Sequence, residues 1–289
     1  MSGTKALILG GETGLLGMSL AAVLDDAGWE VTSTPRPDKD AWNPVVLAEL
    51  LDSHAPDVVF NTWAYTQVDL AEDEPDQAQR VNAVLPEILG RLAADRPFKL
   101  VHYSTDFVFG GKADAPRKEE DTPAPECVYG RTKLQGERAL LALNLPDLLI
   151  IRTAWLFGPG KKNFVRTMLD LCRKSNCISV VHDQKGSPTY TPDLAEYSLN
   201  LVRADAKGIY HVANAGRASW CELASEALHS AGVPCEVTAI PSADYPQKAK
   251  RPAYSVLDTS RFTETTGITP RSWVQAVRDY VYRETTQQG

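Results

Sequence analysis

The chain has 289 residues, 43% of them hydrophobic, and a formal net charge of −7. This length and apolar content suit one large α/β domain or two joined domains, and they exclude an intrinsically disordered chain. The negative charge argues against a surface for nucleic acid or for an anionic membrane. No apolar run reaches the length of a membrane span and the first residues carry no signal-peptide pattern, so we expect a cytoplasmic protein.

The cysteines and histidines do not form a metal-binding pattern. The five cysteines are odd in number and scattered, without a Cys-x-x-Cys pair, and they are Cys127, Cys172, Cys177, Cys221 and Cys235. We expect them to be reduced and mostly buried. The five histidines are equally dispersed, and the sequence predicts no metal site.

The chain begins with the pattern of a dinucleotide-binding turn. Residues 5–10 form a short apolar run, which is typical of a strand buried on both faces of a parallel sheet. Gly11, Gly14 and Gly17 follow, and then a helix and a second strand at 29–33. In this fingerprint the glycines allow a tight turn, close approach to a pyrophosphate and helix–strand packing. The alternative is a glycine-rich turn without a ligand.

The end of the second predicted strand bears on the choice of cofactor. An acidic residue at this place usually binds the ribose 2′-hydroxyl of NAD. Here the chain reads Ser33-Thr34-Pro35-Arg36, without a carboxylate. An arginine suits a 2′-phosphate, so the sequence favours NADPH over NADH, with NADH still possible. Arg36 is otherwise a solvated loop charge.

Strands and helices then alternate along the chain. The predicted elements are a helix at 44–53, a strand at 57–62, a long helix from the acidic segment 72–75 to about Asp95, a strand at 99–105, a helix to about Leu143 and a strand at 148–153. This alternation predicts an α/β fold with a Rossmann-type doubly wound parallel sheet.

Beyond residue 156 the alternation loosens, which indicates a smaller C-terminal lobe. The elements expected there are helices at 163–174, 192–203, 220–231 and 270–282 and strands at 178–181 and 208–212. We assign residues 1–156 to an NAD(P)-binding Rossmann domain, with 183–213 returning to it. Residues 157–182 and 214–289 then form the smaller lobe, over the cofactor edge.

Tyr129 and Lys133 lie four residues apart on one face of a predicted helix, at a separation of about 6 Å. A phenol is a weak acid at neutral pH unless a cation stabilises its phenolate, and Lys133 can supply that charge. Alone, this spacing also occurs on solvated helix faces. Thr105 ends a predicted strand, and ligands of such sheets bind at the carboxyl ends of the strands. We therefore expect Thr105, Tyr129 and the glycine turn to meet in one crevice.

Together these segments resemble the extended short-chain dehydrogenase/reductases and, within them, the dTDP-4-dehydrorhamnose reductase family. The matching segments follow the family's order along nearly the whole chain, and they are 11–17, 61–66 with 68–69, Asn82, 104–109, 128–133, 152–155, 163–164, 183–189 and 251–252. Such a series is far more specific than any one of its members.

The resemblance implies roles for individual residues. The catalytic residues would be Thr105, Tyr129 and Lys133. The residues that would bind NAD(P)H are Gly11, Thr13, Gly14, Leu15, Leu16, Arg36, Asp40, Asn61, Thr62, Trp63, Ala64, Tyr65, Asn82, Ser104, Tyr129 and Lys133. The residues that would contact a nucleotide sugar between the two lobes are Asp106, Phe107, Trp155 and Asn163. Asp106 otherwise caps a helix, and Trp155 is otherwise an ordinary interface aromatic.

The chain also departs from the family pattern. Thr62 and Trp63 stand where small residues are usual, which affects the nicotinamide side of the pocket or its width, and Phe107 replaces a frequent tyrosine. Some members use a carboxylate just after the glycine turn in a metal-bridged dimer, whereas Ser19 occupies that region here. We therefore carry over no metal and expect a monomer or a homodimer.

The implied reaction is the NAD(P)H-dependent reduction of a nucleotide-linked 4-keto-6-deoxy sugar. In this family it converts dTDP-4-dehydrorhamnose to dTDP-L-rhamnose for cell-surface polysaccharides, with hydride from NADPH and a proton from Tyr129. Sugar-nucleotide dehydratases carry an Asp-Glu pair after the threonine. Here the pair is Asp106-Phe107, which favours reduction over elimination. The alternatives are another nucleotide-sugar reductase or epimerase, and a non-catalytic NADP-binding subunit similar to the β subunit of methionine adenosyltransferase.

Overall fold

A computed structural model describes residues 3–35, 43–111, 113 and 115–286. Its centre is a six-stranded sheet with the order β10-β5-β4-β3-β1-β2, in which every neighbouring pair is parallel. The strands are β1 (Lys5–Leu9), β2 (Glu30–Thr34), β3 (Val58–Asn61), β4 (Lys99–Thr105), β5 (Leu148–Thr153) and β10 (Gly208–His211). The predicted doubly wound α/β fold is confirmed. The order reverses between β1 and β3, which places a ligand crevice at their carboxyl ends.

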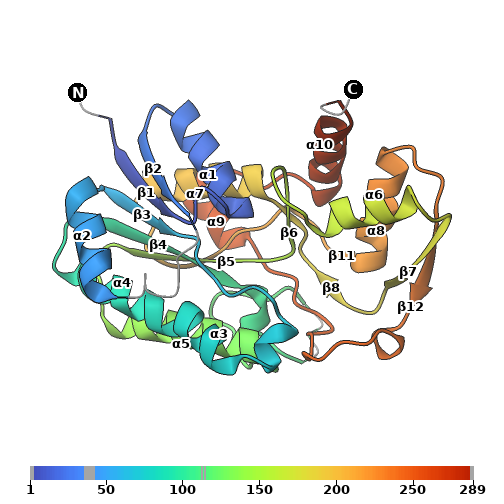
Figure 1. Cartoon of the computed structure of the whole chain (residues 1–289), viewed down its shortest axis with the longest axis horizontal. Coiled ribbons are helices and arrows are strands. Elements are labelled where there is room, and N and C mark those ends of the chain that lie inside the picture. Colours follow the sequence, from blue (N-terminus) through green and yellow to red (C-terminus); the bar gives the residue numbers. More distant parts are fainter. Residues whose placement is uncertain (1–2, 36–42, 112, 114, 287–289) are drawn as a thin grey trace.

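Helices cover both faces of this sheet because the strands are apolar on both sides. Ile8 of β1 packs with α1 and α7, whereas its neighbour Leu7 packs with α2 and α4 on the opposite face. Figure 1 shows the two helical layers. The covering helices are α1 (Leu15–Asp26), α7 (Thr191–Arg203) and α9 (Ser260–Thr266) on one side, and α2 (Pro44–His54), α4 (Leu85–Ala94) and α5 (Val128–Ala142) on the other. No helix within the described residues combines the length and the apolar character needed to cross a membrane.

The long helix expected from the acidic segment to Asp95 is instead a series of short pieces. They are the 3₁₀ turn η1 (Leu70–Glu72), α3 (Pro75–Gln79), the π-helical turn η2 (Arg80–Val84) and α4. Pro75 begins α3 and Pro86 lies in the first turn of α4. Proline lacks the N–H that continues a helix, so each proline marks a new start. The wide turn between them holds Asn82 in the interior.

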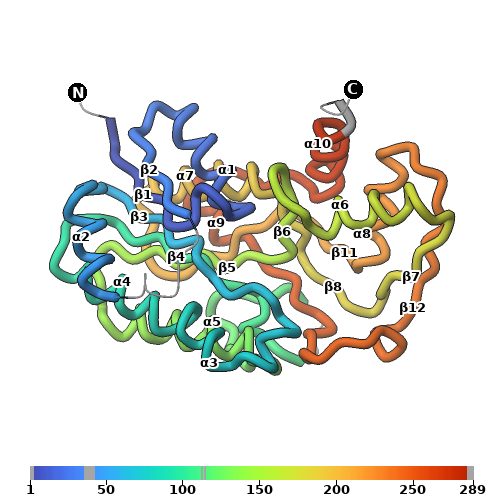
Figure 2. Tube along the Cα trace, viewed as in Figure 1, coloured from blue at the N-terminus to red at the C-terminus, as the bar shows by residue number. Residues whose placement is uncertain are grey.

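A smaller lobe lies at the other end of the long axis from α2 (Figure 2). Its core joins α6 (Phe164–Cys172), α8 (Trp220–Ser230) and α10 (Trp273–Thr286). Its strands were not all expected from the sequence, and they are β6 (Leu156–Phe157), β7 (Cys177–Val181), β8 (Lys185–Gly186), β9 (Thr189–Tyr190), β11 (Ala218–Ser219) and β12 (Glu236–Ile240). The unpredicted α9 packs through Phe262 into the core of the main sheet.

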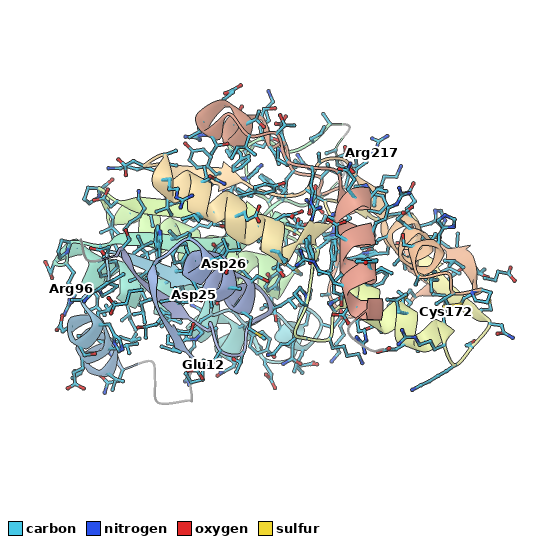
Figure 3. The ribbon with its side chains drawn as sticks, turned by 90° about the horizontal axis from the view of Figure 1, so that it is seen from above. Glu12, Asp25, Asp26, Arg96, Cys172 and Arg217 are labelled. Atoms are coloured by element: carbon cyan, nitrogen blue, oxygen red, sulfur yellow. A yellow bond between two sulfur atoms is a disulfide. The ribbon has the colours of Figure 1, made fainter. Side chains whose placement is uncertain are left out.

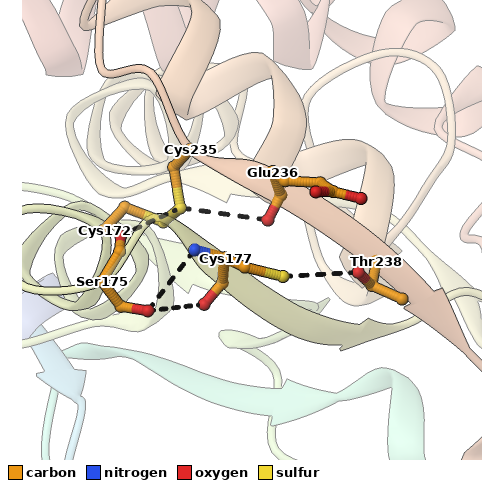
Figure 4. The surroundings of a disulfide bond; sticks show 6 residues. All are labelled: Cys172, Ser175, Cys177, Cys235, Glu236 and Thr238. Atoms are coloured by element: carbon orange, nitrogen blue, oxygen red, sulfur yellow. Dashed lines mark hydrogen bonds between the residues drawn. A yellow bond between two sulfur atoms is a disulfide. The ribbon is translucent and has the colours of Figure 1, made fainter.

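The expectation of five reduced, mostly buried cysteines is wrong for this lobe. Cys172 at the end of α6 forms a disulfide with Cys235, with a Cα–Cα distance of 5.7 Å, and Cys177 is exposed beside Thr238 (Figure 4). The parallel pairing of β7 with β12 brings these cysteines together. Because β12 has no apolar run, this pairing could not be predicted from the sequence. Figure 3 shows Cys172 far from Arg96, which lies beyond α4 in the main domain.

Candidate active site

A cavity of about 630 Å³ opens where the glycine turn, the carboxyl ends of β3, β4 and β5, the start of α5 and the smaller lobe meet. Fourteen of the predicted site residues line this cavity. They are Thr13, Gly14, Leu15, Leu16, Thr62, Trp63, Ala64, Ser104, Thr105, Asp106, Phe107, Tyr129, Lys133 and Trp155. Arg36 and Asp40 lie outside the described residues, and Gly11, Asn61, Tyr65, Asn82 and Asn163 do not line the cavity.

The glycine turn presents the start of α1 to this cavity. Gly10 has a φ of +92°, which is easy for glycine alone, and its carbonyl accepts the N–H of Gly14 at 2.8 Å. Gly14 is the N-cap of α1 and has no side chain to bond the free N–H groups of the first turn. Such N–H groups, with the helix dipole, favour a phosphate. Gly11 instead packs against β2, where an added Cβ would lie 2.3 Å from Ser33 Oγ.

Tyr129 stands in the first turn of α5 and reaches the cavity. Cys127 caps this helix, its sulfur accepting the N–H of Gly130 at 3.4 Å. Phe107 packs edge-to-face on the Tyr129 ring, with centroids 5.5 Å apart. Burial raises the pKa of the Tyr129 phenol, and a hydrogen bond with Thr105 works in the opposite direction. The phenol therefore stays protonated at neutral pH and can act as a proton donor.

Lys133 lies one helical turn further and is 2% exposed. Its ammonium donates to the carbonyl of Tyr103 at 2.6 Å. Burial lowers the pKa of Lys133 to about 8, partly offset by the charge of Glu137. The amine is therefore still largely cationic at neutral pH.

Asp106 is buried and holds two hydroxyl groups. Its carboxylate accepts from Ser255 Oγ at 2.5 Å and from Thr105 Oγ at 3.0 Å. Burial raises the pKa of Asp106 to about 6, despite these bonds. The carboxylate thus ties Thr105 at the end of β4 to the segment that carries Ser255. Sequence reasoning missed Ser255, because its partner lies 149 residues away.

Replacing Asp106 with Asn should stabilise the protein at pH 8 by about 1–3 kcal/mol, since a one-unit pKa shift is worth about 1.4 kcal/mol. The pKa of Asp106 rises from its ordinary 3.8 to about 6 on folding. Between these values the folded state binds more protons than the unfolded state, so stability falls as pH rises through that window. Urea titrations at pH 8 and pH 4 measure the effect. We expect little change at pH 4, and the same substitution at the exposed Asp76 should change neither value. A destabilised Asp106→Asn at pH 8 would contradict the buried-charge account.

Asn61, Asn82 and Asn163, which were predicted to contact the cofactor or the substrate, form hydrogen bonds within the protein. Asn82 Oδ1 accepts the N–H of Tyr65 at 2.9 Å, and Asn82 Nδ2 donates to the Tyr65 carbonyl at 3.1 Å. Asn163 caps α6 through the N–H of Arg166 at 3.1 Å and also donates to the Tyr280 hydroxyl. These amides fix backbone around the site. Asn61 belongs to a separate buried chain of contacts described below.

Trp220 of the smaller lobe forms an aromatic wall with the predicted Trp155, and the sequence did not reveal this partner. Trp155 has a φ of +47° and stacks on Trp220, with centroids 3.5 Å apart and planes at 5°. Trp220, Lys161 and Arg251 also line the cavity. One face of Trp155 is therefore covered by protein. Of Trp220, Lys161 and Arg251, only Arg251 belongs to a segment singled out in the sequence.

Arg251 is held at the cavity by the main domain. Its guanidinium contacts Asp69 at 2.8 Å and 3.2 Å, and the N–H of Ala249 donates to the same carboxylate at 2.9 Å. These bonds lower the pKa of Asp69, although desolvation opposes them. The pair therefore joins the two lobes at the edge of the cavity.

Among the described residues, no group of three or more His, Cys, Asp or Glu side chains is arranged to hold a metal ion.

Comparison with known proteins gives consistent matches over nearly the full chain. The family model described as the RmlD substrate binding domain matches residues 4–286. Spore coat polysaccharide biosynthesis protein SpsK of Bacillus subtilis is 38% identical, covering 96% of this chain and 97% of its own. The dTDP-4-dehydrorhamnose reductase of Aggregatibacter actinomycetemcomitans is 39% identical, with 94% and 97% covered. The crystal structure of dTDP-4-dehydrorhamnose reductase from Bacillus anthracis in complex with NADP is 31% identical, with a TM-score of 0.93 and 97% and 99% covered.

Proposed function

The chain belongs to the family of the RmlD substrate binding domain, and we propose that it reduces a nucleotide-linked 4-keto-6-deoxy sugar with NADPH, converting dTDP-4-dehydrorhamnose to dTDP-L-rhamnose. The observation that carries this proposal is the meeting of Thr105, Tyr129 and Lys133 with the glycine turn around one cavity. Relatives named for this reductase and a relative that binds NADP support the same activity.

The residues that line the cavity fit NADPH, and different residues bind the cofactor and transfer the proton. The uncapped start of α1 suits the pyrophosphate, and Thr13 and Leu15 line that side. When bound, NADPH supplies the hydride that reduces the sugar C4 carbonyl. Tyr129 donates its proton to the alkoxide that develops on O4. Lys133 stabilises the phenolate left behind.

Thr105 would hold the same sugar oxygen. Its hydroxyl is oriented by the Asp106 carboxylate and accepts the N–H of Phe107 at 3.2 Å. A threonine hydroxyl has one hydrogen, so Thr105 would turn that hydrogen from Asp106 to the sugar oxygen as the alkoxide develops there. Asp106 therefore acts through Thr105, since both of its oxygens already hold protein hydroxyls.

Phe107 supports reduction over water elimination. A dehydratase needs a second carboxylate after the threonine to move a further proton. In this chain the position holds an aromatic ring that packs on Tyr129. The remaining carboxylate, Asp106, is bonded to Thr105 and Ser255. Carbonyl reduction needs one proton donor, which Tyr129 supplies, and no second carboxylate.

The direct test is the oxidation of NADPH, followed by its absorbance, with dTDP-4-dehydrorhamnose as substrate. We expect turnover that depends on both compounds, and dTDP-L-rhamnose as the product. Turnover with a different keto sugar only would keep the reductase and change its substrate. Tight NADPH binding without turnover of any keto sugar would favour the regulatory, non-catalytic alternative.

Arg36→Ala tests the cofactor preference inferred from the sequence. We expect KM for NADPH to rise about 10- to 100-fold, the cost of losing a hydrogen bond to a charged group, while KM for NADH stays the same. Steady-state rates with each cofactor measure both values. The same substitution at the exposed Arg91 is the control. Equal losses with the two cofactors would rule out a contact with the 2′-phosphate.

Further features belong to the same proposal. We place the protein in the cytoplasm, as a monomer or homodimer without nucleic-acid or membrane partners, in keeping with its net charge of −7. We divide the chain into a cofactor domain, residues 1–156 with 183–213, and a nucleotide-sugar lobe, residues 157–182 and 214–289. The separate core around α6, α8 and α10 supports this division, with α9 as an added return to the main sheet.

A further inference from the structure

A buried chain of side chains runs behind the cavity from the end of β3 to α5. Asn61 Oδ1 accepts the N–H of Trp63 at 3.2 Å, so its Nδ2 is the atom that faces His102. That Nδ2 lies 3.0 Å from His102 Nδ1. On the other side of the ring, His102 Nε2 lies 3.4 Å from Lys133 Nζ. Asn61 and His102 are 1% and 0% exposed, and neither lines the cavity.

These contacts determine the tautomer of His102. An amide Nδ2 can only donate, so His102 Nδ1 must accept and therefore carries no proton. Burial and the charge of Lys133 hold the pKa of His102 well below its ordinary value, so the ring is neutral. A neutral ring with a bare Nδ1 carries its proton on Nε2. The Nε2–H group therefore points toward Lys133.

This arrangement disfavours a proton on the amine of Lys133. An ammonium group has donors only, so an ammonium and an Nε2–H that face each other cannot share a hydrogen bond. A neutral amine has a lone pair that can accept from Nε2–H. The carbonyl of Tyr103, at 2.6 Å, accepts a hydrogen from Nζ in either state. The imidazole is thus a selective partner for the uncharged amine.

The other groups around Lys133 do not offer a hydrogen bond that favours the neutral amine. Glu137, on the same helix, favours the ammonium, but its carboxylate is bonded to Arg152 of β5 at 2.9 Å and 2.7 Å. Tyr129 lies in the preceding turn of α5 and Asp106 in η3 (Asp106–Val108), and both line the cavity together with Lys133. His102 is the neighbour whose protonated nitrogen faces the amine.

We propose that Asn61 and His102 are positioning residues that hold the Lys133 amine from behind and favour its neutral form. The proposal rests on the reductase function, in which protonated Lys133 assists Tyr129. Activity should then fall as pH rises through the pKa of Lys133, near 8. The imidazole adds to the effect of burial on the Lys133 amine and so helps to set the pH of this alkaline fall. Asn61, expected from the sequence to contact the cofactor, acts through His102 and Lys133.

The tautomer can be measured without substrate. Protein carrying ¹⁵N-labelled histidine should show His102 at neutral pH with a bare Nδ1 and a protonated Nε2, assigned by comparison with His102→Gln. The signal should persist without titrating across the acid range in which the protein stays folded. A proton on Nδ1 would overturn the proposal whatever the enzyme's activity. This measurement does not depend on turnover. A lack of turnover with every keto sugar would contradict the reductase function and would leave the tautomer of His102 as a separate result.

Two variants test the effect on Lys133 through the pH dependence of kcat/KM. Asn61→Leu adds no charge and leaves His102 free to turn a bare Nε2 toward the ammonium. His102→Gln can place an amide oxygen there. In both variants the alkaline fall should move up by roughly one pH unit, the size of an ordinary environmental shift. Asn214→Leu makes the same change at a buried amide that bonds Tyr190, Asp193 and Arg271 and does not line the cavity, and it should lower stability without moving the fall.

An alkaline fall that stays at the wild-type pH in the variants would contradict the proposal. If Asn61→Leu does not fold, His102→Gln decides alone, because it leaves Asn61 and its bond to Trp63 intact. A shift shared by Asn214→Leu would show a general effect of loosened packing and would equally overturn the specific role of His102.

Discussion

Tyr129→Phe should lower kcat by about 10²- to 10⁴-fold, the range for loss of a positioned general acid. The substitution removes the proton donor and keeps the ring, whose edge-to-face contact with Phe107 orders the start of α5. Tyr129 was itself expected to contact NAD(P)H, but the glycine turn and Lys133 are untouched, so the Kd for NADPH should rise by no more than about tenfold, the loss of one neutral hydrogen bond. Steady-state rates and NADPH fluorescence titration measure the two quantities.

Tyr245→Phe is the matched control, because Tyr245 is 51% exposed and lies outside the cavity. It should leave kcat and NADPH binding as they are. Wild-type kcat in Tyr129→Phe would mean that another group delivers the proton. Equal losses in kcat and in NADPH affinity would instead assign the phenol to cofactor binding.

The features predicted well from the sequence are those that depend on one short segment of the chain. The apolar run before the glycine turn gave β1, and the turn itself gave the start of α1. Tyr129 and Lys133 share a helix, so their spacing alone placed them together. Thr105 was expected at a strand end and stands there. Such residues need only the local backbone and the parallel sheet to reach the crevice.

The features missed by sequence reasoning depend on contacts between distant segments. Ser255 bonds Asp106 across 149 residues, and Trp220 stacks on Trp155 from another helix. Neither residue stands in a pattern that would separate it from other serines or tryptophans. His102 lies in the strand predicted at 99–105 and was counted only among the dispersed histidines, because its two neighbours come from β3 and α5. Its chemistry becomes visible only when both ring nitrogens have known partners.

Arg152→Met should lower the free energy of unfolding by about 3–5 kcal/mol, the usual cost of leaving one partner of a buried ion pair alone. Arg152 and Glu137 are 3% and 1% exposed at their side chains, and two hydrogen bonds of 2.9 Å and 2.7 Å join them. Without the guanidinium, the Glu137 carboxylate is buried without its cation, one turn of α5 away from Lys133. Urea titration measures the loss.

The double variant Arg152→Met with Glu137→Leu distinguishes an unpaired charge from lost packing. Replacing a buried pair by apolar residues of similar volume is often nearly neutral, so the double variant should recover most of the stability. Arg91→Met breaks the exposed pair with Glu87 and should cost less than about 1 kcal/mol. A double variant as unstable as Arg152→Met would mean that Arg152 acts mainly through its stacking on Phe109. Recovery would show that the cost of Arg152→Met comes from leaving the buried Glu137 carboxylate without its partner on β5.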